Sequence, residues 1–348
     1  GVSGSTVTFG DGADAMVVTG ELSGSTVSTG SGADGVTLSA RAINSSINAG
    51  DGADLITVSG SLVSSTVSGG SGADSIRVIS GVNASQILGQ QDNDLISLDG
   101  AATSSGVYGG QGDDTIRIGG DVTGGNVEGN SGNDSISIVG TATNAVVAGG
   151  QGNDTLDIGA VTGGQVGGQI GADSLIVRGS VLNAVVSMTS ASDPNSYDDG
   201  NDTLRVIGSV SNSTVYSGFG IGGFVDLSDG ADSLSAATAN AVTVSGGVDN
   251  DTFLISGTAA ASSLVGGFGA ELITVTTALN NSTIYGGEPT DGSSVLDGAD
   301  TISVGAASAS VIYGNYGDDR ITVGGAATAT TIVGGVGNDL MSVAGAFS

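Results

Sequence analysis

Residues 69–77 read GGSGADSIR, residues 109–117 read GGQGDDTIR, and residues 149–157 read GGQGNDTLD. Each stretch joins a glycine-rich turn to an aspartate and then to a short segment in which apolar and polar residues alternate. Glycines permit backbone conformations that aim carbonyl oxygens at one point, and the aspartate adds negative charge there. Alternation with a period of two is typical of a β-strand with one buried face. The recurring unit is therefore an acidic turn followed by a strand.

The acid of this turn recurs along the whole chain. From residue 14 to residue 154 it returns every 20 residues, and afterwards steps of 19 or 20 residues alternate with three steps of 29 or 30. Self-similarity at such a period is the signature of a repeat architecture. The sixteen register acids are Asp14, Asp34, Asp54, Asp74, Asp94, Asp114, Asp134, Asp154, Asp173, Asp202, Asp232, Asp251, Glu271, Asp300, Asp319 and Asp339.

Two apolar columns accompany the acids. One lies two and four positions after the acid, as at Ile76 and Val78, and the other lies seven positions before it, as at Val67. Two residues before the second column the position is small, as at Ser65, which indicates a narrow core. Glycine and β-branched residues disfavour helix, and no stripe with a 3.6-residue period survives. We predict an all-β fold, a right-handed parallel β-solenoid of about 16 coils, each with roughly 20 residues and two strands, continuous over residues 1–348.

The turns resemble the RTX, or haemolysin-type, calcium-binding repeat, whose nonapeptide is G-G-x-G-x-D-x-U-x with U a large aliphatic residue. The resemblance covers nearly the whole chain, and fourteen of the sixteen turns keep the glycine two residues before the acid. It implies that Ca²⁺ lies between successive turns, held by carboxylates and turn carbonyls. The sixteen register acids are then candidate ligands for about 15 ions. Four further turn acids are either auxiliary ligands or solvated residues, namely Asp11, Asp51, Asp113 and Asp318.

Some turns depart from the RTX pattern. The departures are Asp92 and Asp249 in place of the glycine, Glu271 in place of the aspartate, and insertions before Asp202, Asp232 and Asp300. The other half of the coil, as at residues 59–64, carries no recurring acid, so we expect calcium along one edge only, unlike the usual RTX β-roll with sites on both edges. Without cations, carboxylates about 5 Å apart on adjacent coils repel each other. We therefore expect metal binding to be coupled to folding.

The composition excludes several classes of protein. The net charge is −29, with 6 Arg and no Lys, so the chain lacks the cationic clusters that bind nucleic acid or anionic membranes. His and Cys are absent as well, which removes the usual general bases and nucleophiles, and we expect no enzymatic activity. No apolar run approaches the roughly 20 residues that span a bilayer. An acidic, metal-dependent chain without Lys suits the outside of a bacterial cell, so we expect an extracellular or cell-surface location.

Three insertions, near residues 188–200, 218–230 and 286–298, leave from the acid-bearing edge. Insertions on one side of a repeat protein often mark a contact surface, so these loops either bridge to a neighbour through cations or are tolerated surface loops. Their acids are Asp193, Asp198, Asp199, Asp226, Asp229, Glu288, Asp291 and Asp297. Both terminal coils read as ordinary repeats, so we expect either a longer protein or ends that stack on other copies.

Together these features favour an extracellular calcium-dependent structural protein, a subunit or segment of a self-assembling filament or S-layer-like lattice. Such a protein would form a homo-oligomer or polymer through its ends, faces or acidic loops. The alternative is a repeat spacer or ligand-binding segment of a large RTX adhesin. Ice binding is a third reading, but it needs a regular Thr/Asn row. The third turn position is irregular and runs Asp11, Ser31, Asp51, Ser71, Gln91, Gln111, Ser131 and Gln151.

Overall fold

The computed structural model describes residues 1–188, 203–211, 213–216, 220–221, 224–225, 231, 233–287 and 297–348. The chain divides into two compact units, Gly1–Val166 and Gly167–Ser348. In these described ranges the regular structure is all β-strand, and no helix that could cross a membrane is present. Within each unit, strands of successive coils pair in parallel at intervals near 20 residues. The predicted parallel β-solenoid is therefore confirmed, whereas its handedness stays a prediction.

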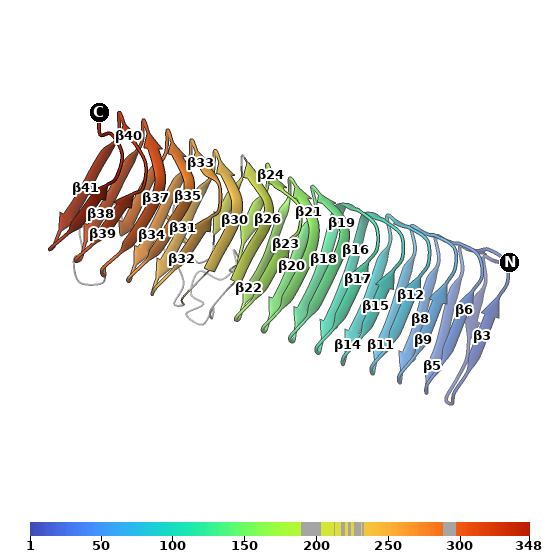
Figure 1. The fold of residues 1–348 in the computed structure, drawn as a ribbon. Coiled ribbons are helices and arrows are strands. Elements are labelled where there is room, and N and C mark those ends of the chain that lie inside the picture. Colours follow the sequence, from blue (N-terminus) through green and yellow to red (C-terminus); the bar gives the residue numbers. More distant parts are fainter. Residues whose placement is uncertain are drawn as a thin grey trace. The chain divides into compact units, whose positions relative to one another are not determined.

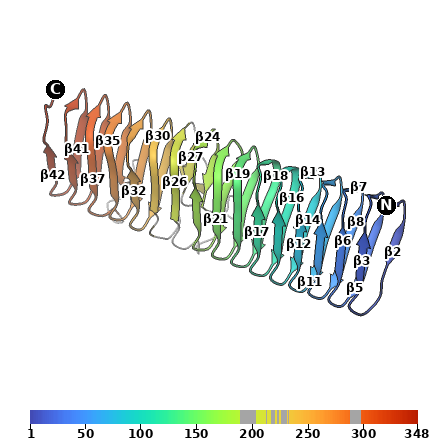
Figure 2. The same ribbon diagram turned by 45° about the vertical axis from the view of Figure 1, so that its right-hand side comes forward.

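The first unit has three strand positions in each coil, and β5, β8 and β11 follow one another there (Figures 1 and 2). The strands before the acid turn are β2 (Thr6–Thr8), β5 (Thr26–Ser31), β8 (Ser46–Asp51), β11 (Thr66–Ser71), β14 (Gln86–Gln91), β16 (Ala102–Gln111), β18 (Val122–Ser131) and β20 (Val146–Gln151). The strands after it are β3 (Ala15–Val18), β6 (Gly35–Leu38), β9 (Leu55–Val58), β12 (Ser75–Val78), β15 (Leu95–Leu98), β17 (Thr115–Ile118), β19 (Ser135–Thr143) and β21 (Thr155–Thr162). The short strands that open the coils are β1 (Val2–Ser3), β4 (Leu22–Ser23), β7 (Ala42–Ile43), β10 (Leu62–Val63) and β13 (Val82–Asn83).

The short opening strands show that the prediction of two strands per coil was wrong. Leu22 and Leu62 begin two of these strands and are fully buried, so they add a third apolar column to the core. A residue in the left-handed region ends each of them, as at Asn44 (φ 48°) and Ser64 (φ 48°), and turns the chain into the next strand. A two-residue strand is too short to show alternation, which explains why the sequence pattern did not reveal it.

The two predicted apolar columns are confirmed by the register of the strands. β11 pairs with β8 and β14, so that Val67 lies beside Ile47 and Ile87. β12 pairs with β9 and β15 in the same way, and the side chains along both columns are buried except in the terminal coils, where Met341 is exposed. Because every coil repeats these positions, each apolar side chain packs against the equivalent side chain of the next coil. This packing removes the apolar columns from water and stabilises the stack of coils.

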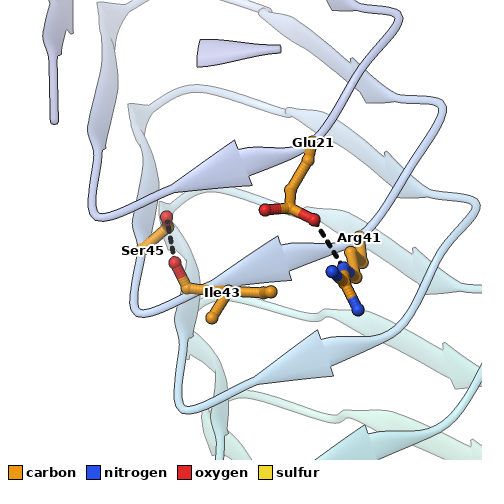
Figure 3. A network of polar contacts seen from close by, with 4 residues as sticks. All are labelled: Glu21, Arg41, Ile43 and Ser45. Carbon is orange, nitrogen blue, oxygen red and sulfur yellow. Dashed lines mark hydrogen bonds and ion pairs between the residues drawn. The ribbon is translucent and has the colours of Figure 1, made fainter. Parts of the chain in front are cut away.

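The predicted small inward position forms a ladder of buried serines. The backbone N–H of Ser45 donates to Oγ of Ser65 at 3.1 Å, and that Oγ donates to the carbonyl oxygen of Val63 at 2.9 Å. Figure 3 shows the same short bond from Ser45 to the carbonyl of Ile43, together with an exposed ion pair between Glu21 and Arg41. Each hydroxyl thus both donates and accepts, which satisfies it inside the protein.

The second unit repeats the same arrangement. Its strands before the third insertion are β22 (Gln165–Ile170), β23 (Ser174–Val177), β24 (Val181–Leu182), β25 (Val185–Ser187), β26 (Thr203–Ser211), β27 (Thr214–Tyr216), β28 (Gly220–Ile221), β29 (Phe224–Val225), β30 (Ser233–Asn240), β31 (Thr243–Val248), β32 (Thr252–Ile255), β33 (Thr258–Ala260), β34 (Ser263–Phe268), β35 (Leu272–Asn280) and β36 (Thr283–Gly287). Those after it are β37 (Thr301–Ser308), β38 (Val311–Tyr316), β39 (Arg320–Val323), β40 (Ala327–Thr328), β41 (Thr331–Val336) and β42 (Leu340–Val343).

The three predicted insertions fall mostly outside the described residues. In the second of them β28 and β29 form a short antiparallel pair, with Gly220 opposite Val225. Of the eight insertion acids, only Asp297 lies in the described part of the chain. The prediction that these acids bridge to a neighbour therefore stays a prediction.

Candidate metal sites along the acid turns

The described register acids lie at the turns between two strands of a coil, with their side chains buried except at Asp14 and Asp339, which are half-buried. In the coil that contains β11 and β12, the chain turns at Gly72, whose φ of 111° lies in the left-handed region that favours glycine. Asp74, which follows, has only 3% of its surface exposed, and Asp114 only 2%. Carboxylates are almost never buried to this degree unless they are paired or bind a metal.

One oxygen of each carboxylate accepts a hydrogen bond from the neighbouring coil. The backbone N–H of Asp74 donates to Oδ1 of Asp94 at 2.7 Å, and that of Asp94 donates to Oδ1 of Asp114 at 2.7 Å. The same bond joins successive acids from Asp14 to Asp154 in the first unit. In the second unit it joins Glu271 to Asp300, Asp300 to Asp319 and Asp319 to Asp339. We call this column of linked carboxylates the acid ladder.

The second oxygen, Oδ2, is left without such a bond. Among the described residues, Oδ2 is buried and has no hydrogen-bond partner at Asp34, Asp54, Asp74, Asp94, Asp114, Asp134, Asp300 and Asp319. An ionised carboxylate can only accept, and a buried acceptor with no partner is costly. The buried Oδ2 without a partner recurs in coil after coil, so it is a regular property of the repeat. A bound cation would supply the missing partner.

Glycine creates the space in which Oδ2 lies. A Cβ atom added at Gly89 would lie 2.2 Å from Oδ2 of Asp94 and 2.5 Å from the carbonyl oxygen of Gly109 in the next coil. A glycine stands five residues before the acid from Gly69 onward except before Asp202, Asp232 and Asp300, which follow insertions, whereas the first three coils carry Phe9, Thr29 and Ala49 there. Strand pairing between β11 and β14 includes Ser68 and Gly70 but skips Gly69. Carboxylate and carbonyl oxygens thus converge at an interruption of the sheet.

Burial raises the pKa of the ladder acids, because the charged form loses its contact with water. The pKa of Asp74 is raised from 3.8 to about 6, and the pKa of Asp94 and of Asp114 to about 7. The backbone N–H bond to Oδ1 lowers these values, and the neighbouring carboxylates raise them again. Near neutral pH these carboxyl groups therefore hold a proton unless a cation close to Oδ2 stabilises the charged form.

The residues present fit a hard divalent cation of the calcium class. The converging atoms are all oxygens, from carboxylates and from turn carbonyls, which are the ligands that hard cations take. Soft metals would prefer Cys or His, and the sequence contains neither. The buried Oδ2 atoms of the ladder and the adjacent carbonyls would hold the ions, one between each pair of successive turns.

The second unit contains a variation on the ladder. Asp173, Asp251, Glu271, Asp300 and Asp319 are buried there, whereas the predicted ligands Asp202 and Asp232 lie outside the described residues. Ligand oxygens of Glu271, Asp297 and Asp300 lie within 4.8 Å of one another. Asp297 had been expected only as an insertion acid. The repeat spacing does not predict that Asp297 lies beside the ladder. In the sequence, the one indication of this is that Asp297 stands three residues before Asp300.

The four turn acids considered as auxiliary ligands lie on the solvent side of the turn. Asp11, Asp51, Asp113 and Asp318 are exposed. Oδ1 of Asp113 accepts the backbone N–H of Asn133 at 2.7 Å, and Oδ1 of Asp318 accepts that of Asn338 at 2.7 Å. At Asp113 and Asp318 the carboxylate therefore links neighbouring coils at the surface, away from the buried ladder.

Comparison with known proteins supports the fold. No family model matches the chain, and no curated protein matches it either. Among solved structures it is similar to the X-ray crystal structure of a hyperactive, Ca²⁺-dependent, β-helical antifreeze protein from an Antarctic bacterium. The TM-score is 0.58 at 20% sequence identity, over 82% of this chain and 83% of that chain. At this identity the similarity concerns the parallel β-solenoid itself.

Proposed function

We propose that this chain is an extracellular calcium-dependent structural protein, a subunit or segment of a self-assembling filament or S-layer-like lattice. The observation that carries the proposal is the acid ladder, whose buried Oδ2 atoms have no hydrogen-bond partner among the described residues. Calcium, when bound, would supply the positive charge that the ladder lacks. The Ca²⁺-dependence of the similar β-helical protein is in keeping with this role.

A structural role suits these residues better than a catalytic one. The titratable groups with raised pKa belong to the ladder, where they face the neighbouring coils instead of an open cleft. The chain also lacks His, Cys and Lys. Acid–base chemistry by paired carboxylates would require substrate to reach side chains that are only a few per cent exposed.

Assembly is supported by the chemistry of the outward strand positions. The outward residues of β12 and β15 include Ser75, Leu95 and Ser97, and those of β9 include Leu55 and Thr57. Leu55 and Leu95 are 54% and 39% exposed. The same face carries Arg77, whose guanidinium is paired with Asp99 at 2.8 Å, so two copies could pack together without burying an unpaired ion there.

A calcium titration followed by far-UV circular dichroism and sedimentation tests both parts of the proposal. We expect chelation to weaken the β-sheet signal and to lower the urea midpoint, calcium to restore both, and the sedimentation coefficient to increase with protein concentration at high calcium. An unchanged spectrum after exhaustive chelation would contradict calcium dependence. A protein that is strictly monomeric at high calcium and high concentration would contradict assembly and favour the adhesin-spacer alternative.

Ice binding is a further candidate, suggested by the antifreeze activity that names the similar protein. The turn residues that could form a flat row do align, since Ser71 pairs with Asp51 on one side and with Gln91 on the other. Their chemistry nevertheless changes from coil to coil, whereas ice binding needs a regular Thr/Asn row. We therefore expect no thermal hysteresis from the calcium-loaded protein, and a clear hysteresis gap would favour ice binding over the assembly role.

A further inference from the structure

We propose that Glu271, Asp297 and Asp300 form a cation site distinct from the regular ladder sites, which binds a calcium-class ion more tightly than they do. The inference rests on the proposed calcium-dependent function and adds that one site has a higher affinity than the others. Glu271 lies between β34 and β35, and Asp300 lies directly before β37. Asp297 is not a register acid and belongs to the last residues of the third insertion.

The first observation is the convergence of three carboxylates. Ligand oxygens of all three residues lie within 4.8 Å of one another, and within the described residues no other three acids meet this closely. Each regular turn contributes one buried carboxylate, so a site between two successive turns has two, whereas Asp297 adds a third here. Calcium affinity rises with the number of charged ligands, so a third carboxylate favours tighter binding.

The second observation is that Glu271 is buried and its ionised carboxylate meets no N–H or hydroxyl donor. Its side chain is 2% exposed, and no such donor in the described ranges reaches Oε1 or Oε2. The carboxyl group of Asp300 lies close enough to share a proton with it, and a cation would take the place of that proton. At a regular position, Oδ1 accepts the backbone N–H of the preceding acid. The glutamate side chain is one methylene longer, and both of its oxygens remain for another ligand. Asp300 is 1% exposed, and its Oδ2 likewise meets no N–H or hydroxyl donor among the described residues.

The surrounding backbone holds two of the three side chains, those of Asp297 and Asp300, in place. Oδ2 of Asp297 accepts the backbone N–H of Tyr316 at 3.0 Å, and Oδ1 of Asp300 accepts that of Glu271 at 2.9 Å. A Cβ atom added at Gly287 would lie 1.9 Å from Oδ2 of Asp297, so this glycine leaves room for that carboxylate. The arrangement is built from fixed backbone contacts, and such preorganisation favours selective binding.

Asp297 provides the decisive test, because its replacement leaves every register acid intact. Calcium-loaded full-length protein is dialysed against a series of chelator-buffered calcium solutions, and bound calcium is counted by elemental analysis. The wild type should keep about one ion per chain at a free calcium concentration on the order of tenfold below that which empties the ladder. Asp297→Asn should lose this last ion together with the ladder ions.

Asp318→Asn is the matched control, because it removes the same charge from an exposed acid of the neighbouring turn. It should keep the last ion as the wild type does, and circular dichroism at saturating calcium should be the same for all three proteins. If Asp297→Asn and Asp318→Asn release their last ion at the same free calcium, the tight site is refuted while the ladder stands. If the wild type binds no calcium, the proposed function fails as well.

Discussion

At the scale of single residues, the contrast between Ser65 and Asp74 explains why the acid turn calls for a cation. The serine hydroxyl donates to one carbonyl and accepts one backbone N–H, so it is satisfied in the core. The carboxylate has two oxygens and no proton to donate. Oδ1 of Asp74 accepts the N–H of Asp54, whereas Oδ2 faces Gly69 and finds no donor among the residues described.

Asp114→Asn changes this situation at one position. The amide can keep the bond from the N–H of Asp94 while its NH₂ group replaces Oδ2. At saturating calcium we expect fewer bound ions and a loss of about 1–3 kcal/mol in the free energy of unfolding. Without metal at pH 8 we expect the opposite sign, because one buried charge has been removed. Calcium counting and urea unfolding measure both effects.

The adjacent exposed acid provides the control for that variant. Asp113→Asn also removes one charge and keeps an acceptor for the N–H of Asn133. We expect its ion count and stability to match the wild type. Equal ion counts in Asp114→Asn and Asp113→Asn would show that the buried carboxylate is not a ligand.

Gly89→Ala tests the space beside Oδ2. The added methyl group would meet both Oδ2 of Asp94 and the carbonyl of Gly109, so we expect weaker calcium binding and a loss of about 1–3 kcal/mol in the free energy of unfolding. Gly35→Ala is the control, because nothing but a carbonyl 4.0 Å away approaches its added Cβ. Calorimetric calcium titration of both variants should separate them, and identical affinities would contradict the predicted role of the glycine.

At the scale of elements, the acid ladder makes the metal-free protein sensitive to pH. Burial raises the pKa of Asp94 and Asp114 from 3.8 to about 7 and the pKa of Asp134 to about 6. The folded chain therefore holds protons more tightly than the unfolded chain. The resulting stability is fully present below about pH 4 and is lost as the pH rises through 6 to 7.

We accordingly expect the metal-free protein to be more resistant to urea at pH 5 than at pH 8. At limiting calcium the trend should reverse, because the ions require deprotonated carboxylates. Urea midpoints measured at several pH values, in chelator and in buffered calcium, test this crossing. Metal-free stability that increases from pH 5 to pH 8 would contradict the predicted sign.

The serine ladder should contribute stability without binding metal. Ser65→Ala leaves the N–H of Ser45 without its partner, at a cost of about 1–3 kcal/mol, whereas the carbonyl of Val63 keeps the N–H of Asn44. We expect lower unfolding midpoints in urea both with and without calcium, and an unchanged ion count. A reduced ion count would instead show that calcium binding at the acid ladder depends on the serine hydroxyl groups.

At the scale of the whole molecule, periodicity made most of the fold predictable. The 20-residue spacing of the acids and the apolar columns around Val67 and Ile76 fix the parallel pairing, because identical positions stack. The opening strands such as β10 escaped prediction, since two residues carry no pattern. The sequence did not predict that Asp297 lies beside Glu271. Asp297 belongs to an insertion, and the repeat spacing does not determine the path of an insertion.

A crystal structure of the calcium-loaded protein tests the central claim most directly. We predict anomalous density between successive acid turns, within about 2.3–2.6 Å of Oδ2 of Asp94 and Asp114 and of the turn carbonyls beside them. Density showing only hydrogen-bonded water at these oxygens, or no ordered atom at all, would contradict the claim that divalent cations join the coils.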